Sequence, residues 1–219
     1  MYSQHERKSR AVIILPKAKL VIVENPKCGS STLKKTFKGL FYEPKLPDSG
    51  KTLPKHARII RWKELSQHRQ YNGYVSVGIC RNPMAWVRSW YKFWNNPKLA
   101  HNTINLNFTQ FTENYLEQKY KSTNFKTQSF YLDYRGAIGV DYLFPLENLG
   151  NVLEIAKSRW EGEMPYVKQS IANRSSERHV EALGEKLESD LKQHLSRDWT
   201  IYNKSLSRSR FEQQNIEFE

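Results

Sequence analysis

The sequence has little cysteine, no long apolar run and no internal repeat. Two cysteines among 219 residues are too few for a disulfide framework. No apolar stretch approaches the ~20 residues that cross a bilayer. The run from Ala11 to Leu15 is too short for a signal-peptide core and ends at Pro16. These absences favour a soluble protein of the reducing cytoplasm.

Acidic residues are few beside basic ones. The chain has 35 Lys and Arg against 22 Asp and Glu, a formal net charge of +13, which attracts anionic ligands. It has no zinc-finger spacing, no RNA-binding aromatic motif and no basic region joined to heptads. The basic residues are scattered, and only short basic tails stand out, at about 1–10 and 204–219. We therefore expect an acidic small-molecule ligand and no nucleic-acid partner.

Length and composition predict one α/β domain over residues 1–219. A hydrophobic content of 38%, with 13% aromatic residues, is enough for a sizeable core. Apolar runs at 20–23 and 74–80 each precede a helical pattern, which is typical of a parallel sheet flanked by helices. Helices are also expected around 57–69, from residue 108 and, as one long helix or a pair, between residues 180 and 195.

A lysine-bearing loop follows the first of these strands. Residues 26–32 read Pro-Lys-Cys-Gly-Ser-Ser-Thr and lead into a helical repeat. Amides at a helix start lack partners within the helix and bind anions, and a glycine allows close approach of the backbone. An ordinary ATP or GTP loop ends in Gly-Lys-Ser or Gly-Lys-Thr, whereas here Lys27 precedes Gly29. The order therefore predicts a phosphate site of another kind.

A second cationic motif follows the strand 74–80. Arg81 stands at the strand end, Asn82 is suited to cap a helix, and Pro83 suits the first helical position. Ser89 lies on the predicted helix 84–94. Arginine can make paired hydrogen bonds to phosphate oxygens. Two strand ends that deliver cations to one edge of a sheet match the usual ligand position of open α/β folds.

Together these motifs resemble those of sulfotransferases that use 3'-phosphoadenosine 5'-phosphosulfate (PAPS), in particular the carbohydrate-type enzymes of family 2. The resemblance covers about residues 19–203. Its weaker parts are three. Residues 128–132 and 140–149 together are similar to a strand followed by a Glu-x-Leu segment. Residues 171–176 are similar to an Asn-x-Ser loop, and residues 197–202 to a segment with Asp followed by an aromatic residue. It implies a P-loop-like three-layer fold with a central, mainly parallel sheet flanked by helices.

The resemblance also implies a site and a reaction. The sulfuryl group of PAPS would pass to a hydroxyl of a carbohydrate or related acceptor by in-line displacement, with adenosine 3',5'-bisphosphate (PAP) as product and no metal. Lys27 would stabilise the leaving side, and Arg81 with Ser89 would hold the 3'-phosphate. The implied cofactor-binding residues are Lys27, Cys28, Gly29, Ser30, Ser31, Thr32, Arg81, Ser89, Arg174 and Ser175.

The general base has three candidates. His56 lies between the two phosphate motifs, where related sulfotransferases place a catalytic histidine, and neutral imidazole accepts a proton near pH 7. Glu24 and Glu64 are the alternatives, since other sulfotransferases use a glutamate. Cys28 and Cys80, both at predicted strand ends, are interpreted as structural.

Other functions stay open at this point. A nucleotide kinase with a variant loop and a non-catalytic polyanion-binding protein both fit a basic chain with a lysine loop. The cationic excess would also suit an acidic acceptor such as a uronic-acid sugar. Related animal enzymes of the Golgi usually carry a membrane anchor at the amino terminus, and this sequence has no apolar run long enough for one. We therefore expect either a bacterial or phage relative or a shortened form of a longer protein.

Overall fold

The computed structural model describes residues 12–42, 58–96, 106–120, 126–168 and 180–216 of the chain. Its strands are β1 (Val12–Leu15), β2 (Leu20–Val23), β3 (Val75–Cys80), β4 (Asp133–Tyr134), β5 (Ala137–Ile138) and β6 (Tyr142–Pro145). Its α-helices are α1 (Ser30–Thr36), α2 (Ile59–Leu65), α3 (Pro83–Trp94), α4 (Phe108–Leu116), α5 (Gln128–Leu132), α6 (Gly150–Ser158), α7 (Glu185–His194) and α8 (Ser196–Ile216). Short 3₁₀ turns are η1 (Pro16–Ala18), η2 (Arg69–Tyr71) and η4 (Leu146–Asn148).

The central sheet of the described residues has the strand order β1-β2-β3-β6. β2 pairs with β3, and β3 with β6, in parallel, whereas β1 is antiparallel to β2. The register places Val23 opposite Gly78 and Cys80 opposite Pro145. β2, β3 and β6 therefore end at the same edge of the sheet, as the expectation of a mainly parallel sheet requires.

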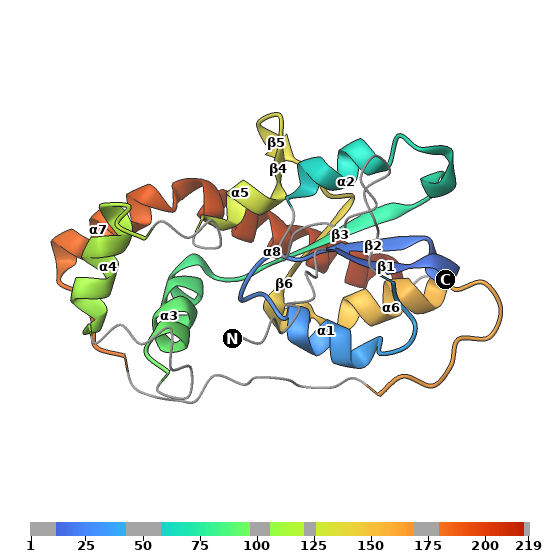
Figure 1. The fold of residues 1–219 in the computed structure, drawn as a ribbon, viewed down its shortest axis with the longest axis horizontal. Coiled ribbons are helices and arrows are strands. Elements are labelled where there is room, and N and C mark those ends of the chain that lie inside the picture. The colour runs from blue at the N-terminus through green and yellow to red at the C-terminus, as the bar shows by residue number, and fades with distance from the viewer. Residues whose placement is uncertain (1–11, 43–57, 97–105, 121–125, 169–179, 217–219) are drawn as a thin grey trace, which may run out of the picture.

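Helices cover both faces of the sheet, which gives three layers. Alternate residues of β2 enter two separate apolar clusters, with Leu20 and Ile22 on one face and Val21 and Val23 on the other. The first cluster takes in residues of α1, α3 and α6, and the second takes in residues of α2, α5 and α8. Figure 1 shows α1 and α6 on one side of the strands and α2 and α5 on the other.

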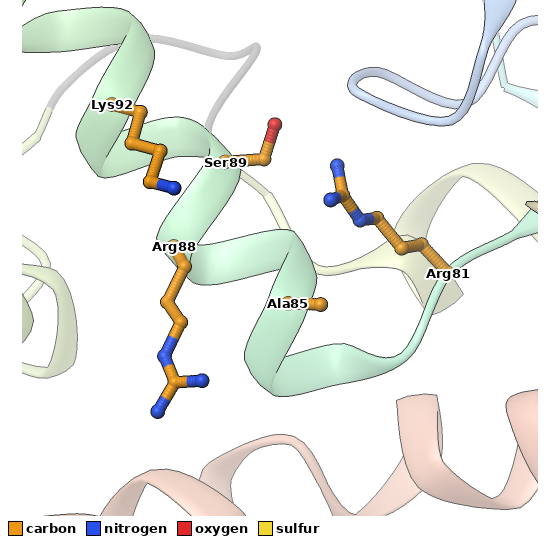
Figure 2. Close-up of a pocket in the computed structure, with 5 residues that line it drawn as sticks. All are labelled: Arg81, Ala85, Arg88, Ser89 and Lys92. Atoms are coloured by element: carbon orange, nitrogen blue, oxygen red, sulfur yellow. The ribbon is translucent and has the colours of Figure 1, made fainter. Parts of the chain in front are cut away.

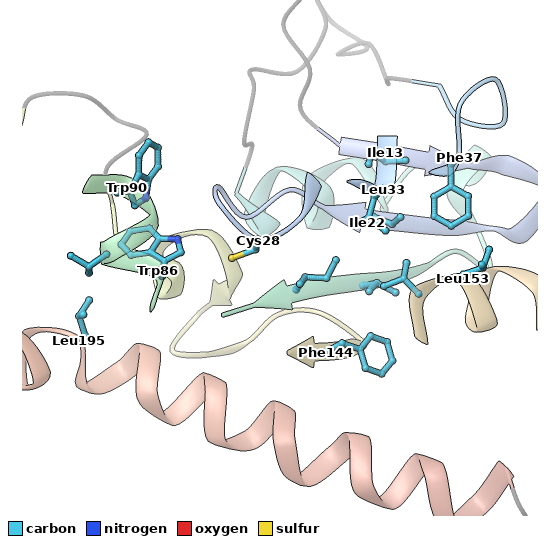
Figure 3. Packing of buried hydrophobic residues seen from close by; sticks show 14 of the residues in the cluster. Ile13, Ile22, Cys28, Leu33, Phe37, Trp86, Trp90, Phe144, Leu153 and Leu195 are labelled. Atoms are coloured by element: carbon cyan, nitrogen blue, oxygen red, sulfur yellow. The ribbon is translucent and has the colours of Figure 1, made fainter. Parts of the chain in front are cut away.

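The first cluster extends beyond the sheet into an aromatic lobe. α3, α4 and α7 gather past the end of β3 (Figure 1), and Trp86 and Trp90 of α3 join the strand residues to Leu195. Figure 3 shows this continuous packing from Phe37 near α1 to Trp90 on α3. The lobe thus fixes α3 in front of the edge where the parallel strands end.

Most of the predicted elements are confirmed. Asn82 caps α3, where its Oδ1 accepts a hydrogen bond from Ala85 N at 3.1 Å, and Pro83 takes the first helical position. Of the long helix or pair predicted between residues 180 and 195, the structure has α7 at Glu185–His194, and α8 begins after that range, at Ser196. Leu191 and Leu195 are fully buried. The backbone of residues 204–216 continues α8.

One predicted element is wrong. Residues 128–132 form the short helix α5, and the strand of that region is β6. The cause is distant in sequence: the carboxylate of Asp198 accepts hydrogen bonds from the amides of Gln128 and Ser129, both at 2.8 Å. Free amides at a helix start are satisfied in this way. Within the described residues, no helix is both long and apolar enough to cross a membrane.

Candidate anion-binding site

The lysine loop lies between β2 and α1, as the sequence predicts. Its backbone turns sharply, because Lys27 and Gly29 both have positive φ, 63° and 83°. Gly29 is the N-cap residue of α1, and Leu33 N donates to Gly29 O at 3.1 Å. Ser30, Ser31 and Thr32 form the first turn of the helix, with Ser31 exposed and Thr32 buried. The strand, loop and helix order is therefore confirmed.

Helix α3 holds this loop in place. Trp86 Nε1 donates to Pro26 O at 2.8 Å, and Arg81 Nη1 lies 3.5 Å from Lys27 O. The ammonium of Lys27 lies 4.3 Å from the ring centroid of Phe93 and 5.7 Å from that of Trp90. Aromatic faces attract cations at these distances. The Lys27 side chain therefore extends from the loop to the face of α3 that carries the second motif.

Arg81 and Ser89 share a small pocket of about 110 Å³ with Ala85, Arg88 and Lys92. Figure 2 shows the Arg81 guanidinium directed toward the Ser89 hydroxyl, while Arg88 points away from Arg81. Ligand pockets for whole small molecules usually span ~300–1,000 Å³, so this one suits a single phosphate-sized group. Its lining of cations and a hydroxyl has the chemistry that binds an oxyanion.

Arg88 of α3 also lines this pocket, and its charge reaches Glu188 of α7. The pKa of the exposed Glu188 carboxyl on α7 is lowered, first by the hydrogen bond from Lys192 and more weakly by the charge of Arg88. The Arg88 side chain points away from Arg81 (Figure 2), so Arg81 is the better candidate to bind a group that also contacts Ser89. Lys92, the other cation of α3 in this lining, comes three residues after Ser89, about one helical turn along α3.

The two motifs are joined by buried polar side chains that sequence reasoning missed. Gln128, fully buried, bonds to the backbone of Arg81 and to the side chains of Asn25 and Cys28. Asp198 is also buried, and its carboxylate accepts a hydrogen bond from the backbone N–H of Gln128. Burial raises the pKa of the Asp198 carboxyl, while hydrogen bonds from Ser129 and Gln128 oppose that rise. The one sequence feature that pointed to Asp198 is the Asp-then-aromatic segment 197–202, and Gln128 lies in residues 128–132, which were predicted as a strand.

The candidate bases fare differently. Glu24 is 2% exposed, and each of its carboxylate oxygens lies 2.8 Å from Lys34 Nζ on α1. This burial and pairing argue against Glu24 as a base, because an acceptor hydroxyl has no access to it. Glu64 is exposed on α2 and pairs with Arg61. His56, Arg174 and Ser175 lie outside the described residues.

Both cysteines are free thiols and buried. Desolvation raises the pKa of Cys28 well above its ordinary value and raises that of Cys80 to about 12. Cys28 Sγ donates to Gln128 Oε1 at 3.4 Å, and Cys80 Sγ to Phe144 O at 3.6 Å. A neutral, hydrogen-bonded thiol is a packing residue, which agrees with their interpretation as structural. Within the described residues, no group of His, Cys, Asp and Glu side chains is placed to hold a metal ion.

Comparison with protein-family models, with curated proteins and with solved structures finds no match to this chain. Function is therefore inferred from the residues and their geometry.

The left-handed conformation of Gly29 gives a first prediction. A Cβ at Gly29 would lie 2.9 Å from Leu146 Cδ1 and 3.2 Å from Leu149 Cδ2, in addition to the backbone strain at φ 83°. We expect Gly29→Ala to lower the free energy of unfolding by about 1–3 kcal/mol in urea denaturation. Gly39→Ala is the matched control, since Gly39 has φ 81° and no atom within 4 Å of its Cβ position. An effect of Gly29→Ala no larger than that of Gly39→Ala would contradict the contact with the leucines.

The raised thiol pKa values give a second prediction. The folded state holds each thiol neutral, and the unfolded thiol has an ordinary pKa of 9.0. This contribution to stability is complete below about pH 9 and is lost as the pH rises toward the folded pKa. At pH 8 we therefore expect iodoacetamide to leave Cys28 and Cys80 unmodified in the folded protein and to alkylate both in urea, as read by mass spectrometry. Rapid alkylation of the folded protein would contradict this assignment.

Proposed function

We propose that this protein is a PAPS-dependent sulfotransferase that transfers a sulfuryl group to a hydroxyl of a carbohydrate or related acceptor. The observation that carries the proposal is the meeting of two cationic motifs at one sheet edge. The Lys27 loop follows β2, and Arg81 follows β3, its parallel neighbour. PAPS has anionic groups at its 5' and 3' positions, which match two such motifs.

The donor set suits these groups. The loop offers backbone amides at the start of α1, the hydroxyls of Ser30, Ser31 and Thr32 and the ammonium of Lys27. The pocket offers the guanidinium of Arg81 and the hydroxyl of Ser89. We assign the loop to the 5'-phosphosulfate and the pocket to the 3'-phosphate. The pocket volume of about 110 Å³ is the right size for one phosphate group. The loop alone would also suit other phosphates, so the proposal of PAPS as the ligand depends on both motifs together.

The bound donor would supply an activated sulfuryl group with a phosphate as leaving group. Lys27 would place its positive charge beside the developing charge of that phosphate, because fixed charges in a water-poor site stabilise a transition state strongly. Arg81 and Ser89 would hold the far end of the nucleotide and so orient the reacting centre. His56 stays the sequence-based prediction for the group that accepts the proton of the acceptor hydroxyl.

Ligand binding separates this function from the alternatives. We expect PAP, without magnesium, to raise the melting temperature of the protein, and Lys27→Ala or Arg81→Ala to abolish the rise. Lys157→Ala is the control for general charge, since Lys157 is an exposed lysine of α6 that pairs with Glu154. It should keep the full PAP effect.

Two results would contradict the proposal. Equal stabilisation by ATP with magnesium would favour a nucleotide kinase. Binding of heparin that Lys27→Ala and Arg81→Ala leave unchanged, in the absence of any PAP effect, would favour a polyanion-binding protein.

A further inference from the structure

The Gln128 side chain lies fully buried between the two cationic motifs. It is the first residue of α5 and belongs neither to the lysine loop nor to the Arg81 pocket. Its amide nevertheless contacts residues on both sides of the site. A buried amide that joins two loops fixes their separation, since breaking its hydrogen bonds would leave polar atoms unsatisfied.

Gln128 binds Arg81 through the main chain. Arg81 N donates to Gln128 Oε1, and Gln128 Nε2 donates to Arg81 O, both at 2.8 Å. This pair of bonds resembles that between residues on neighbouring antiparallel strands. It fixes the backbone of Arg81 just after the end of β3 and leaves the guanidinium directed toward Ser89 (Figure 2).

The same amide oxygen reaches the lysine loop. Gln128 Oε1 accepts from Asn25 Nδ2 at 3.2 Å and from Cys28 Sγ at 3.4 Å. Asn25 and Cys28 flank the Pro26-Lys27 pair, and Asn25 Nδ2 lies also 3.1 Å from Ile79 O on β3. One oxygen atom therefore gathers donors from the loop after β2 and from the residue after β3.

The position of Gln128 is itself fixed. Asp198 on α8 accepts the Gln128 amide at 2.8 Å, and its side chain is 1% exposed. The aromatic residues of α5 are packed too, with Tyr131 2% exposed. The backbone of Gln128 is therefore held rigidly, and its side-chain amide has a fixed position. A residue that positions other residues needs this rigidity.

We propose that Gln128 is a positioning residue that sets the spacing between the Lys27 loop and Arg81, so that both motifs bind one ligand carrying two phosphate groups. This inference rests on the proposed function. When two sites are held at the spacing of a ligand's two groups, binding of the first group presents the second at high local concentration. Loss of the spacing weakens a bisphosphate and leaves a monophosphate unaffected.

The test is the ratio of two dissociation constants, measured by calorimetry without magnesium for PAP and for adenosine 5'-monophosphate. We expect the wild type to prefer PAP, and Gln128→Met to lower that preference by about tenfold or more while its affinity for the monophosphate stays the same. Methionine keeps the length of the side chain and removes its hydrogen bonds. A general loss of stability would not change the ratio.

Ser76→Ala is the matched control. Ser76 is also fully buried, and its hydroxyl bonds to Asp141 at 2.7 Å, but it lies near the start of β3, away from the end that leads to Arg81. We expect this variant to lose stability and to keep the wild-type preference for PAP.

Gln128→Glu gives a second test that survives poor folding of the methionine variant. A protonated glutamic acid can accept from Arg81 N and donate to Arg81 O, as glutamine does, whereas a carboxylate repels that carbonyl. Burial favours the protonated form. For Gln128→Glu, the preference for PAP over adenosine 5'-monophosphate is divided by the wild-type preference at the same pH. We expect this relative preference to rise as the pH is lowered from 8 to 5.5.

The outcomes are distinct. A wild type that prefers PAP, with Gln128→Met showing the same preference or with Gln128→Glu losing its preference as the pH is lowered, would overturn the positioning role and leave the proposed function standing. An equal loss of both ligands in Gln128→Met would also overturn it. A wild type that binds neither nucleotide would overturn the proposed function itself.

Discussion

The parallel pairing of β2 with β3 is the constraint on which the site depends. Because both strands run in the same direction, the loops that leave them emerge at one edge of the sheet. One loop carries Lys27 and the other Arg81, and the lobe formed by α3, α4 and α7 stands in front of that edge (Figure 1). Two cationic motifs separated by more than fifty positions in the sequence thereby lie at the same edge of the sheet.

Packing converts this adjacency into a defined geometry. Trp86 fixes the lysine loop from the side of α3, and Gln128 fixes it from the side of α5. The rings of Phe93 and Trp90 hold the Lys27 ammonium near the helix that bears Ser89. The polar groups of the site rest on buried aromatic and amide contacts, so their positions are set before any ligand arrives. Such preorganisation is what binding and electrostatic catalysis need.

The sequence allowed the frame of this site to be predicted, and the reasons are local. Leu20 to Val23 is a continuous apolar run, and Asn82 with Pro83 is a helix-start signal, so β2 and α3 could be found without tertiary information. Helix α5 could not, because Asp198, which caps it, lies 70 residues after Gln128. The roles of Gln128 and Asn25 were missed for the same reason. A buried polar residue has no periodic signal, and its partners are known only once the chain is folded.

The central claim is that one ligand with two phosphate groups joins the Lys27 loop to the Arg81 pocket. A crystal structure of the complex with PAP tests it most directly. We predict the 5'-phosphate at the start of α1, within hydrogen-bond distance of Lys27, and the 3'-phosphate between Arg81 and Ser89. PAP bound with neither phosphate at these residues, or with both phosphates at one of the two motifs, would contradict the claim.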